Sequence, residues 1–308
     1  MAERGFEELR EKMLKSAKAG ISKAYQSEEY ALMQAVNAQI ETSRSYNLAF
    51  ERLSEWQGLY LPEIKMGNPK SLAKLVIELC SGRIDREAIS EALGEGGKPD
   101  EVISSISSTM GRKMEEEEAA VVAGFAKQIL SMADSLDMLD KYIKAAANRI
   151  LPNTTYLTDH MIAAELLSRA GSLERLATMP AGTVQLLGAE KALFKHIKFG
   201  SRPPKYGILF KLSDVTNAQK EIKGKIARAY ATKICIALKA DCFSKNFIAE
   251  GLKKSLNESI KRIREKPITH KKEDNRNSFS RERNRNSRGF RGRGDRDNGF
   301  RKQRRQRY

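Results

Sequence analysis

One heptad repeat constrains the fold of this chain more than any other sequence feature. Between residues 114 and 150, apolar side chains recur every seven residues in two offset series, and no proline interrupts them. The first series is Val122, Ile129, Leu136, Ile143 and Ile150, and the second is Phe125, Met132, Leu139 and Ala146. A repeat of this length predicts one long α-helix with an apolar seam of about four heptads.

A second long helix is predicted from about Ser27 to Gln57. Ser27 is suited to cap its N-terminus, and Gly58 and Pro62 follow its end. It carries a weaker seam at Met33, Val36, Ile40, Ser43, Asn47 and Phe50. We interpret the two helices as an antiparallel coiled-coil hairpin with a helical insert at about 64–112, and the alternative is an ordinary helical bundle. If the hairpin dimerises, the expected interface residues are Val122, Phe125, Ile129, Met132, Leu136, Leu139 and Ile143.

The remainder of the chain predicts shorter helices and almost no β-structure. Helices are expected at about 158–169, 172–178, 188–199, 218–240 and 245–265. The strand signals are limited to short apolar runs at 184–187 and 208–210. We therefore predict an all-α protein with four parts: an N-terminal helical extension (1–26), a coiled-coil dimerisation domain (27–150), a compact helical domain (151–268) and a basic tail (269–308).

The positive charge is concentrated in the second half of the chain. The formal net charge is +17 in 308 residues. Residues 1–150 sum to −4 and residues 151–190 to −2, whereas residues 191–270 carry +13 and residues 271–308 carry +10. This distribution predicts a polyanionic partner. The tail is rich in Arg, Gly and Asn, so we expect it to be disordered and either to contact RNA loosely or to serve as a solubilising segment.

A basic helix is predicted inside the compact domain, from Gly188 to Gly200. Leu193, Phe194 and Ile197 form an apolar stripe on it. A basic face consists of Lys191, Lys195 and Lys198, and Arg202 extends this face beyond the helix end. Like charges at this spacing destabilise a helix, which favours a polyanionic ligand, and a merely solvated face is the alternative.

A second basic set follows at Lys220, Lys223, Lys225, Arg228 and Lys233. Gly224 within this set suggests a close approach of backbone. The neighbouring aromatic residues are expected mainly in the core, and they are Phe194, Phe199, Phe210 and Tyr230. Tyr206 is the exception, because it lies in a loop beside Lys205 and is available for an RNA base.

Enzymatic motifs are missing from the sequence. No GxGxxG follows a strand, no GxxxxGK[ST] is present, and no HExxH surrounds His160, His196 or His270. Cys80, Cys235 and Cys242 lack the spacing of a zinc site or a disulfide framework, and no run of about 20 apolar residues suggests a membrane span. We expect a non-catalytic, soluble protein of a reducing compartment, without a metal or cofactor.

Three segments of the second half are the most specific in the sequence: GAEKALF at 188–194, RPPKYGILF at 202–210 and GKIARAYATKICIALKADCF at 224–243. They resemble the Nop-domain family, the archaeal-type scaffold proteins of box C/D guide ribonucleoproteins and their eukaryotic nucleolar relatives. RLSEWQGLYLPE and YIKAAANRILPN are similar to the ends of that family's two coiled-coil helices. The resemblance covers about residues 27–265. It implies a scaffold that dimerises through the coiled coil and binds guide RNA together with a kink-turn-binding protein.

The resemblance also implies roles for individual residues. Gly188, Ala189, Glu190 and Lys191 would lie at the junction of the RNA and the kink-turn-binding protein. Phosphate contacts would come from Lys195, His196, Arg202, Lys205, Lys223 and Arg228, and Lys198, Tyr206 and Lys225 complete the predicted RNA-binding set. The family also implies recruitment of fibrillarin, the methyltransferase that acts on RNA in the same particle.

The sequence departs from the family pattern at several points. Only about 26 residues precede Ser27, too few for the usual fibrillarin-binding domain, so a paralogue that does not recruit fibrillarin is one alternative. Tyr206 replaces a histidine, Gly182 replaces a hydroxyl residue, and Lys223 replaces an arginine. A spliceosomal-type relative that binds an RNA stem is the other alternative. The expected location is the cytoplasm for an archaeal protein and the nucleolus for a eukaryotic one.

Overall fold

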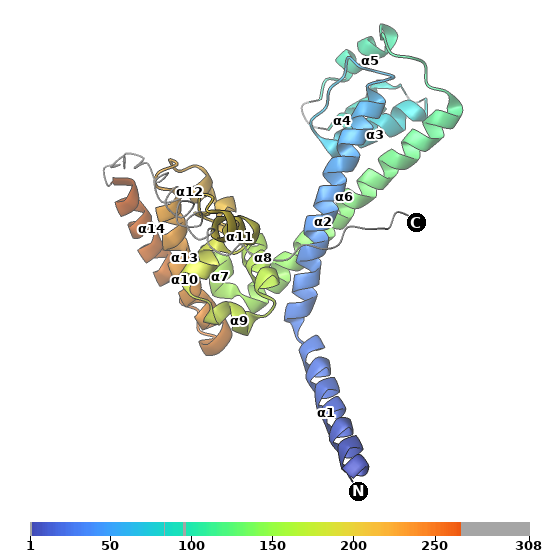
Figure 1. The fold of residues 1–308 in the computed structure, drawn as a ribbon. Helices are drawn as coiled ribbons and strands as arrows, with labels where there is room; N and C mark the ends of the chain where they lie inside the picture. The colour runs from blue at the N-terminus through green and yellow to red at the C-terminus, as the bar shows by residue number, and fades with distance from the viewer. Residues whose placement is uncertain (1, 83, 95–96, 266–308) are drawn as a thin grey trace, which may run out of the picture. The chain divides into compact units, whose positions relative to one another are not determined.

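The computed structural model describes residues 2–82, 84–94 and 97–265. Every regular element in these ranges is a helix, which confirms the all-α prediction (Figure 1). None of these helices is long and apolar enough to cross a membrane. The first six are α1 (Ala2–Tyr25), α2 (Glu28–Gln57), α3 (Pro69–Cys80), α4 (Arg86–Leu93), α5 (Pro99–Ser107) and α6 (Glu116–Ile150).

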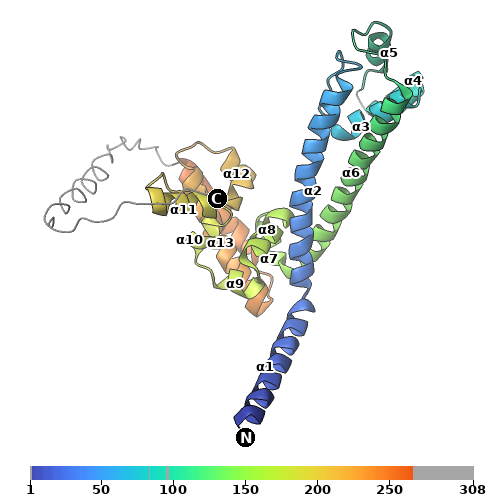
Figure 2. The same cartoon turned by 45° about the vertical axis from the view of Figure 1, so that its right-hand side comes forward.

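Helices α2 and α6 lie side by side and run antiparallel (Figures 1 and 2). Leu53, near the end of α2, packs in one cluster with Val122, near the start of α6. At the other end of the pair, the Arg149 Nε lies 3.4 Å from Glu28 Oε2. The Ser27 hydroxyl caps α2 by accepting a hydrogen bond from the Glu29 amide, as predicted. Supercoiling of the pair stays a prediction.

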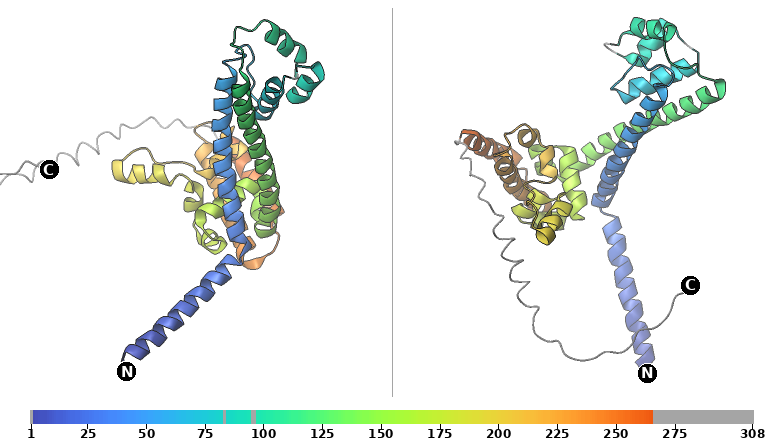
Figure 3. Two further views of the ribbon diagram at one scale, coloured as in Figure 1. Left: turned by 90° about the vertical axis from the view of Figure 1, so that its right-hand side faces the viewer. Right: turned by 45° about the horizontal axis from the view of Figure 1, so that its top comes forward.

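The buried stripe of α6 differs by one position from the predicted seam. Val122, Ile129 and Ile143 are fully buried, in agreement with the first heptad series. Ala126 and Ala133 are buried as well, whereas the second series is half-buried at Phe125, Met132 and Leu139, and so is Leu136 of the first series. The reason is that α6 packs against α3 in addition to α2 (Figure 3), so that small alanines face the interior and allow close helix approach.

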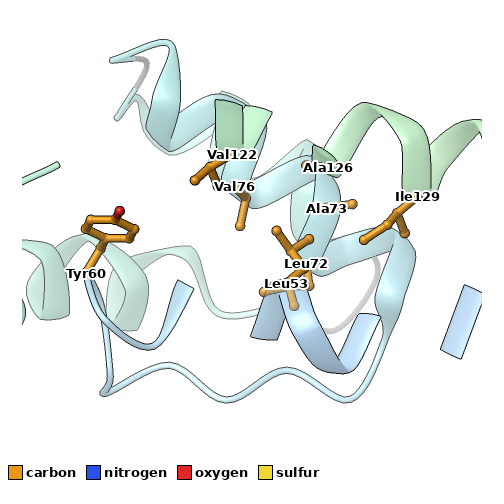
Figure 4. Close-up of a cluster of buried hydrophobic side chains, with 8 residues drawn as sticks. All are labelled: Leu53, Tyr60, Leu72, Ala73, Val76, Val122, Ala126 and Ile129. Atoms are coloured by element: carbon orange, nitrogen blue, oxygen red, sulfur yellow. The ribbon is translucent and has the colours of Figure 1, made fainter. Parts of the chain in front are cut away.

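The segment between α2 and α6 folds into three short helices with two small cores. Asn68 caps α3 by accepting a hydrogen bond from the Lys70 amide at 3.0 Å. One face of α3 joins the core of the long pair, and Figure 4 shows its members: Leu53, Tyr60, Leu72, Ala73, Val76, Val122, Ala126 and Ile129. Its other face contributes Leu75 to a second core with Ile89, Ala92 and Val102 of α4 and α5.

The second half of the described chain contains ten helical elements. They are α7 (Pro152–Leu157), α8 (His160–Ala170), α9 (Leu173–Thr178), α10 (Ala181–Leu186), α11 (Glu190–Phe199), η1 (Ile208–Lys211), α12 (Ser213–Thr216), α13 (Lys223–Lys239), η2 (Ala240–Ser244) and α14 (Ala249–Glu265). Helix α13 is the central one, because it contacts α7, α9, α10, α12 and α14. Helix α8 packs against both α2 and α6.

A buried carboxylate joins two distant segments of this half. Asp241 is 1% exposed and accepts hydrogen bonds from the backbone amides of Asn153 at 2.9 Å and Thr154 at 3.0 Å. The Asn153 amide group and the Thr154 hydroxyl donate to the same carboxylate. These amides are at the start of α7, where they have no partner within the helix. Asp241 therefore fixes the end of α13 and η2 against α7.

Two predicted helix boundaries are wrong. The helix expected at 218–240 begins at Lys223, because residues 219–222 form a turn in which the Ile222 amide bonds to the Gln219 carbonyl. The helix expected from 245 begins at Ala249, after Lys245 adopts a left-handed conformation with φ of 56°. The two short apolar runs at 184–187 and 208–210 lie mainly in α10 and η1 rather than in strands. The predicted tail, 269–308, lies outside the described residues.

Candidate nucleic-acid interface

Helix α11 is the element that carries the predicted basic face. Gly188 precedes it with a φ of +87°, and the Gly188 amide donates to Glu190 Oε1 at 2.6 Å. Gly200, with a φ of +66°, ends the helix as predicted. The Glu190 carboxylate therefore closes the turn that starts the helix. No residue of α11 is buried.

The lysines of α11 are exposed. Lys191, Lys195 and Lys198 follow a spacing that places them on one face of the helix. Within the described part of the chain, none of the three forms an ion pair with a carboxylate. The Lys198 Nζ lies 5.5 Å from the centroid of the Phe199 ring. The face therefore keeps its positive charge available for an anionic ligand.

The apolar stripe of α11 is exposed, contrary to what its periodicity suggests. Phe194, Ile197 and Phe199 are 71%, 70% and 71% exposed, and Leu193 is half-buried. The prediction that Phe194 and Phe199 belong to the core is wrong, because α11 extends away from the helices that form it. Adjacent apolar and basic faces on one helix are suited to a partner that presents both protein and nucleic acid.

His196 contributes to the end of α11. Its Nδ1 is hydrogen-bonded to the Ser201 carbonyl, directly after the helix. This contact is of the kind that caps a helix, whereas the family resemblance implies a phosphate contact for this histidine. The neighbouring Arg202 side chain is exposed. A phosphate contact by either residue stays a prediction.

The second predicted cluster forms around the loop that leads into η1. Gly207 is held against the preceding segment, because its amide donates to the Gln185 carbonyl at 2.9 Å. The Ile208 amide bonds to the Leu187 carbonyl at 2.8 Å. A Cβ atom on Gly207 would lie only 1.9 Å from the Leu187 carbonyl oxygen. Only glycine fits here, and this close contact fixes the position of the adjacent Tyr206.

Two aromatic rings stack beside this loop. The Tyr206 and Phe210 rings lie 4.9 Å apart with an interplanar angle of 13°. The Lys223 Nζ lies 5.0 Å from the Phe210 centroid and donates to the Thr216 carbonyl at 2.7 Å. Phe210 is 39% exposed, so its expected place in the core is wrong. Tyr206, Phe210 and Lys223 together form a rigid, positively charged stack of the kind that accepts unpaired bases.

Gln185 connects the loop to α13, and sequence reasoning did not identify it. Its Nε2 donates to the Lys205 carbonyl at 2.7 Å and lies 3.4 Å from the Gly224 carbonyl. Its Oε1 accepts from Arg228 Nη1 at 3.3 Å. The predicted close approach at Gly224 is an ordinary contact, 3.6 Å from Lys205 Cβ to a built Cβ position. No composition or spacing signal distinguishes Gln185 from a surface glutamine.

Gly188 brings the two clusters together. A Cβ atom added to it would lie 2.6 Å from Ile208 Cγ1, so the start of α11 packs directly on η1. The predicted RNA-binding residues from Gly188 to Lys198 lie in α11 or directly before it. Arg202, Lys205 and Tyr206 lie in the loop between α11 and η1, and the remaining three lie in α13, where Lys225 is exposed near the start of the helix. The described residues contain no group of His, Cys, Asp or Glu side chains that could hold a metal ion. All three cysteines are unpaired.

This arrangement matches a known family. The Nop model, described as "snoRNA binding domain, fibrillarin", matches residues 38–264. An uncharacterized NOP5 family protein of Methanocaldococcus jannaschii is 32% identical over 267 residues, which cover 85% of this chain and 64% of the relative. Nucleolar protein 56 of Dictyostelium discoideum is 35% identical over 242 residues, 75% of this chain and 44% of the relative.

A further relative and one solved structure are also similar to this chain. Nucleolar protein 58 of Schizosaccharomyces pombe is 33% identical over 224 residues, 71% of this chain and 44% of the relative. A solved chain from a fibrillarin/Nop5p complex superimposes with a TM-score of 0.48 at 23% identity, covering 84% of this chain and 78% of the other. The chain spans less than two thirds of the length of these curated relatives. The family match covers most of α2, all of α6 and the basic interface, and the chain belongs to the Nop family.

Proposed function

We propose that this chain is a non-catalytic RNA-binding scaffold of a box C/D ribonucleoprotein that guides 2′-O-methylation. The observation that carries the proposal is α11, within the region that matches the Nop family. Its three exposed lysines have no acidic partner among the described residues and lie beside an exposed apolar stripe. The description of that family as a snoRNA-binding domain supports the same interpretation.

The basic face and the apolar stripe of α11 contact different components of a composite partner. Lys191, Lys195 and Lys198 bind phosphates of the guide RNA, and the affinity therefore depends on salt. Phe194 and Ile197 pack against a kink-turn-binding protein already seated on that RNA. The stack of Tyr206 on Phe210 receives an unpaired base near the kink, next to the ammonium group of Lys223.

Fibrillarin recruitment and dimerisation form the second part of the proposal. The family description, which names fibrillarin, supports fibrillarin as a partner in the particle. The half-buried side chains along α6 support association of two copies through the helix pair. In this scaffold the methyl transfer is carried out by fibrillarin, and this chain holds RNA and enzyme in one particle.

A binding assay with a composite target tests the proposal. The full chain is titrated into a fluorescent box C/D RNA, alone or already bound by its kink-turn-binding protein, at one salt concentration. We expect tight binding to the RNA–protein complex and much weaker binding to the RNA alone. Equal affinity for bare RNA and for the complex would contradict a composite recognition surface. Co-elution of purified fibrillarin with the chain tests recruitment separately.

A further inference from the structure

An exposed aromatic surface lies at the opposite end of α13 from the interface described above. Tyr156 of α7 is 47% exposed and Phe247 of the η2–α14 connection is 56% exposed. Their rings meet edge to face, with centroids 5.6 Å apart. We name this surface the aromatic ledge and define it by Tyr156, Phe247, Lys245 and Lys253. The 17 residues of α13 separate it by about 25 Å from Lys223 at the other end of that helix.

The ledge is rigidly built. Asn153 is 1% exposed, and its Oδ1 accepts a hydrogen bond from the Ile248 amide at 2.7 Å. Its Nδ2 donates to the Asn246 carbonyl at 2.9 Å and to the buried Asp241 carboxylate. These bonds hold both neighbours of Phe247 and so fix the ring against Tyr156. Two aromatic rings are therefore kept in solvent by a buried polar network, although burial would be favourable for both.

The ledge is also positively charged. The Lys253 Nζ donates to the Tyr156 carbonyl at 3.2 Å and lies 5.7 Å from the centroid of its ring. The Lys245 Nζ donates to the Asp241 carbonyl at 2.6 Å. Both ammonium groups thus bond to neutral carbonyl oxygens, and neither pairs with a carboxylate of the described residues. The acidic side chain of Glu250 is exposed nearby in the sequence.

We propose that the aromatic ledge binds an unpaired stretch of RNA. Exposed rings that are held rigid beside unneutralised ammonium groups suit the π-faces of bases and the phosphates that connect them. The charge complementarity favours RNA over an apolar protein partner, because two lysines at the ledge would remain without counter-charges in an apolar interface. This inference rests on the proposed function as an RNA-binding scaffold and adds a second contact, distant from the kink.

The test compares leucine with aromatic substitutions in the full chain. The probe is a fluorescent single-stranded oligouridine, which has no kink turn, and its affinity is measured by anisotropy. Replacing both rings, Tyr156→Leu with Phe247→Leu, keeps an apolar surface but removes stacking and should weaken binding about tenfold. Tyr156→Phe keeps the stacking face and should leave affinity unchanged. The matched control is Tyr142→Leu, which removes an exposed tyrosine from α6.

Each outcome decides the inference. The inference is overturned if the double variant melts like the wild type and binds oligouridine with unchanged affinity. It is also overturned if the double variant no longer binds a protein partner but still binds RNA as the wild type does. If the double variant does not fold, an oligouridine containing 4-thiouridine is crosslinked to the wild-type chain instead. Crosslinks within residues 243–253 support the ledge, and their absence there overturns it. A failure of the proposed function can be told apart from a failure of this inference. The first would show as weak binding of the wild-type chain to the box C/D complex, and the second would show in the binding of oligouridine.

Discussion

At the scale of single residues, backbone contacts fix the interface more firmly than charged side chains do. No carboxylate among the described residues pairs with the lysines of α11, whereas Gly207 and Gly188 lie so close to neighbouring atoms that a methyl group would collide. Gln185 adds three polar contacts between the loop and α13. The flexible lysine side chains therefore project from a tightly packed backbone, which we call the rigid base of the interface.

Gly207→Ala tests this rigid base. The added methyl group would lie 1.9 Å from the Leu187 carbonyl oxygen, and a backbone atom cannot yield as a side chain can. We expect the free energy of unfolding to fall by about 2 kcal/mol, measured by denaturant titration. Gly251→Ala is the matched control, because Gly251 lies in α14 with nothing within 4 Å of a built Cβ. This control should be stabilised by about 0.5 kcal/mol. Equal stability of Gly207→Ala and wild type would refute the close packing.

At the scale of helices, the sequence predicts which segments form helices better than it predicts which faces of those helices are buried. The first heptad series correctly predicts buried Val122, Ile129 and Ile143, because a strict apolar repeat selects the helix face that meets α2. It does not reveal that α3 packs on the same helix. Of the second series, Ala146 is buried as predicted, whereas Phe125, Met132 and Leu139 are only half-buried. Periodicity also shows an apolar stripe on α11, but it does not show whether another element covers that stripe. For this reason Phe194 is wrongly predicted to be buried.

For the candidate nucleic-acid interface, too, the sequence predicts individual residues better than their arrangement. Positive charge and the Nop-like segments lead directly to Lys191, Lys195 and Lys205. Their arrangement depends on contacts between segments about 20 to 40 residues apart, such as the bonds of Gln185 to the Lys205 and Gly224 carbonyls. Such contacts leave no local spacing pattern. For the same reason, the sequence does not indicate that Asn153 holds the connection around Phe247.

The packing of α12, α13 and α14 gives a pH dependence that can be tested. Burial, together with the 2.7 Å hydrogen bond to Asp214, raises the pKa of Tyr230 above its ordinary value. Above pH 10 the unfolded state loses this phenolic proton while the folded state retains it, so the free energy of unfolding should fall as pH rises. Tyr230→Phe has no such proton and should show a smaller fall between pH 9 and about 11 in denaturant titrations. Identical pH profiles would contradict the buried hydrogen bond.

At the scale of the whole molecule, the long helix pair offers a surface for association. Met132, Leu136 and Leu139 are half-buried along α6 after α2 and α3 have packed on it. The remaining apolar area is available to a second copy. Dimerisation through this surface stays a prediction of the heptad pattern.

Sedimentation measures this association directly. Leu136→Glu combined with Leu139→Glu places two charges in the remaining apolar area and should convert a dimer into a monomer. Circular dichroism checks that the double variant is still helical. Met138→Glu is the control, since Met138 is 65% exposed on the same helix, and it should leave the dimer intact. If the wild type is a monomer, or if a dimer survives the double substitution, the apolar seam of α6 packs only within one chain.

The central claim is that the basic face of α11 binds the RNA of a composite RNA–protein target. The most direct measurement is the affinity of Lys191→Glu combined with Lys195→Glu for box C/D RNA already bound by its kink-turn-binding protein. The matched control is Lys141→Glu with Lys144→Glu, which makes the same charge change at exposed positions of α6. We predict that the α11 variant binds at least about tenfold more weakly and loses about two units of slope in a plot of log affinity against log salt, while the control binds almost as wild type does. An α11 variant with the affinity and salt dependence of the control would contradict the account.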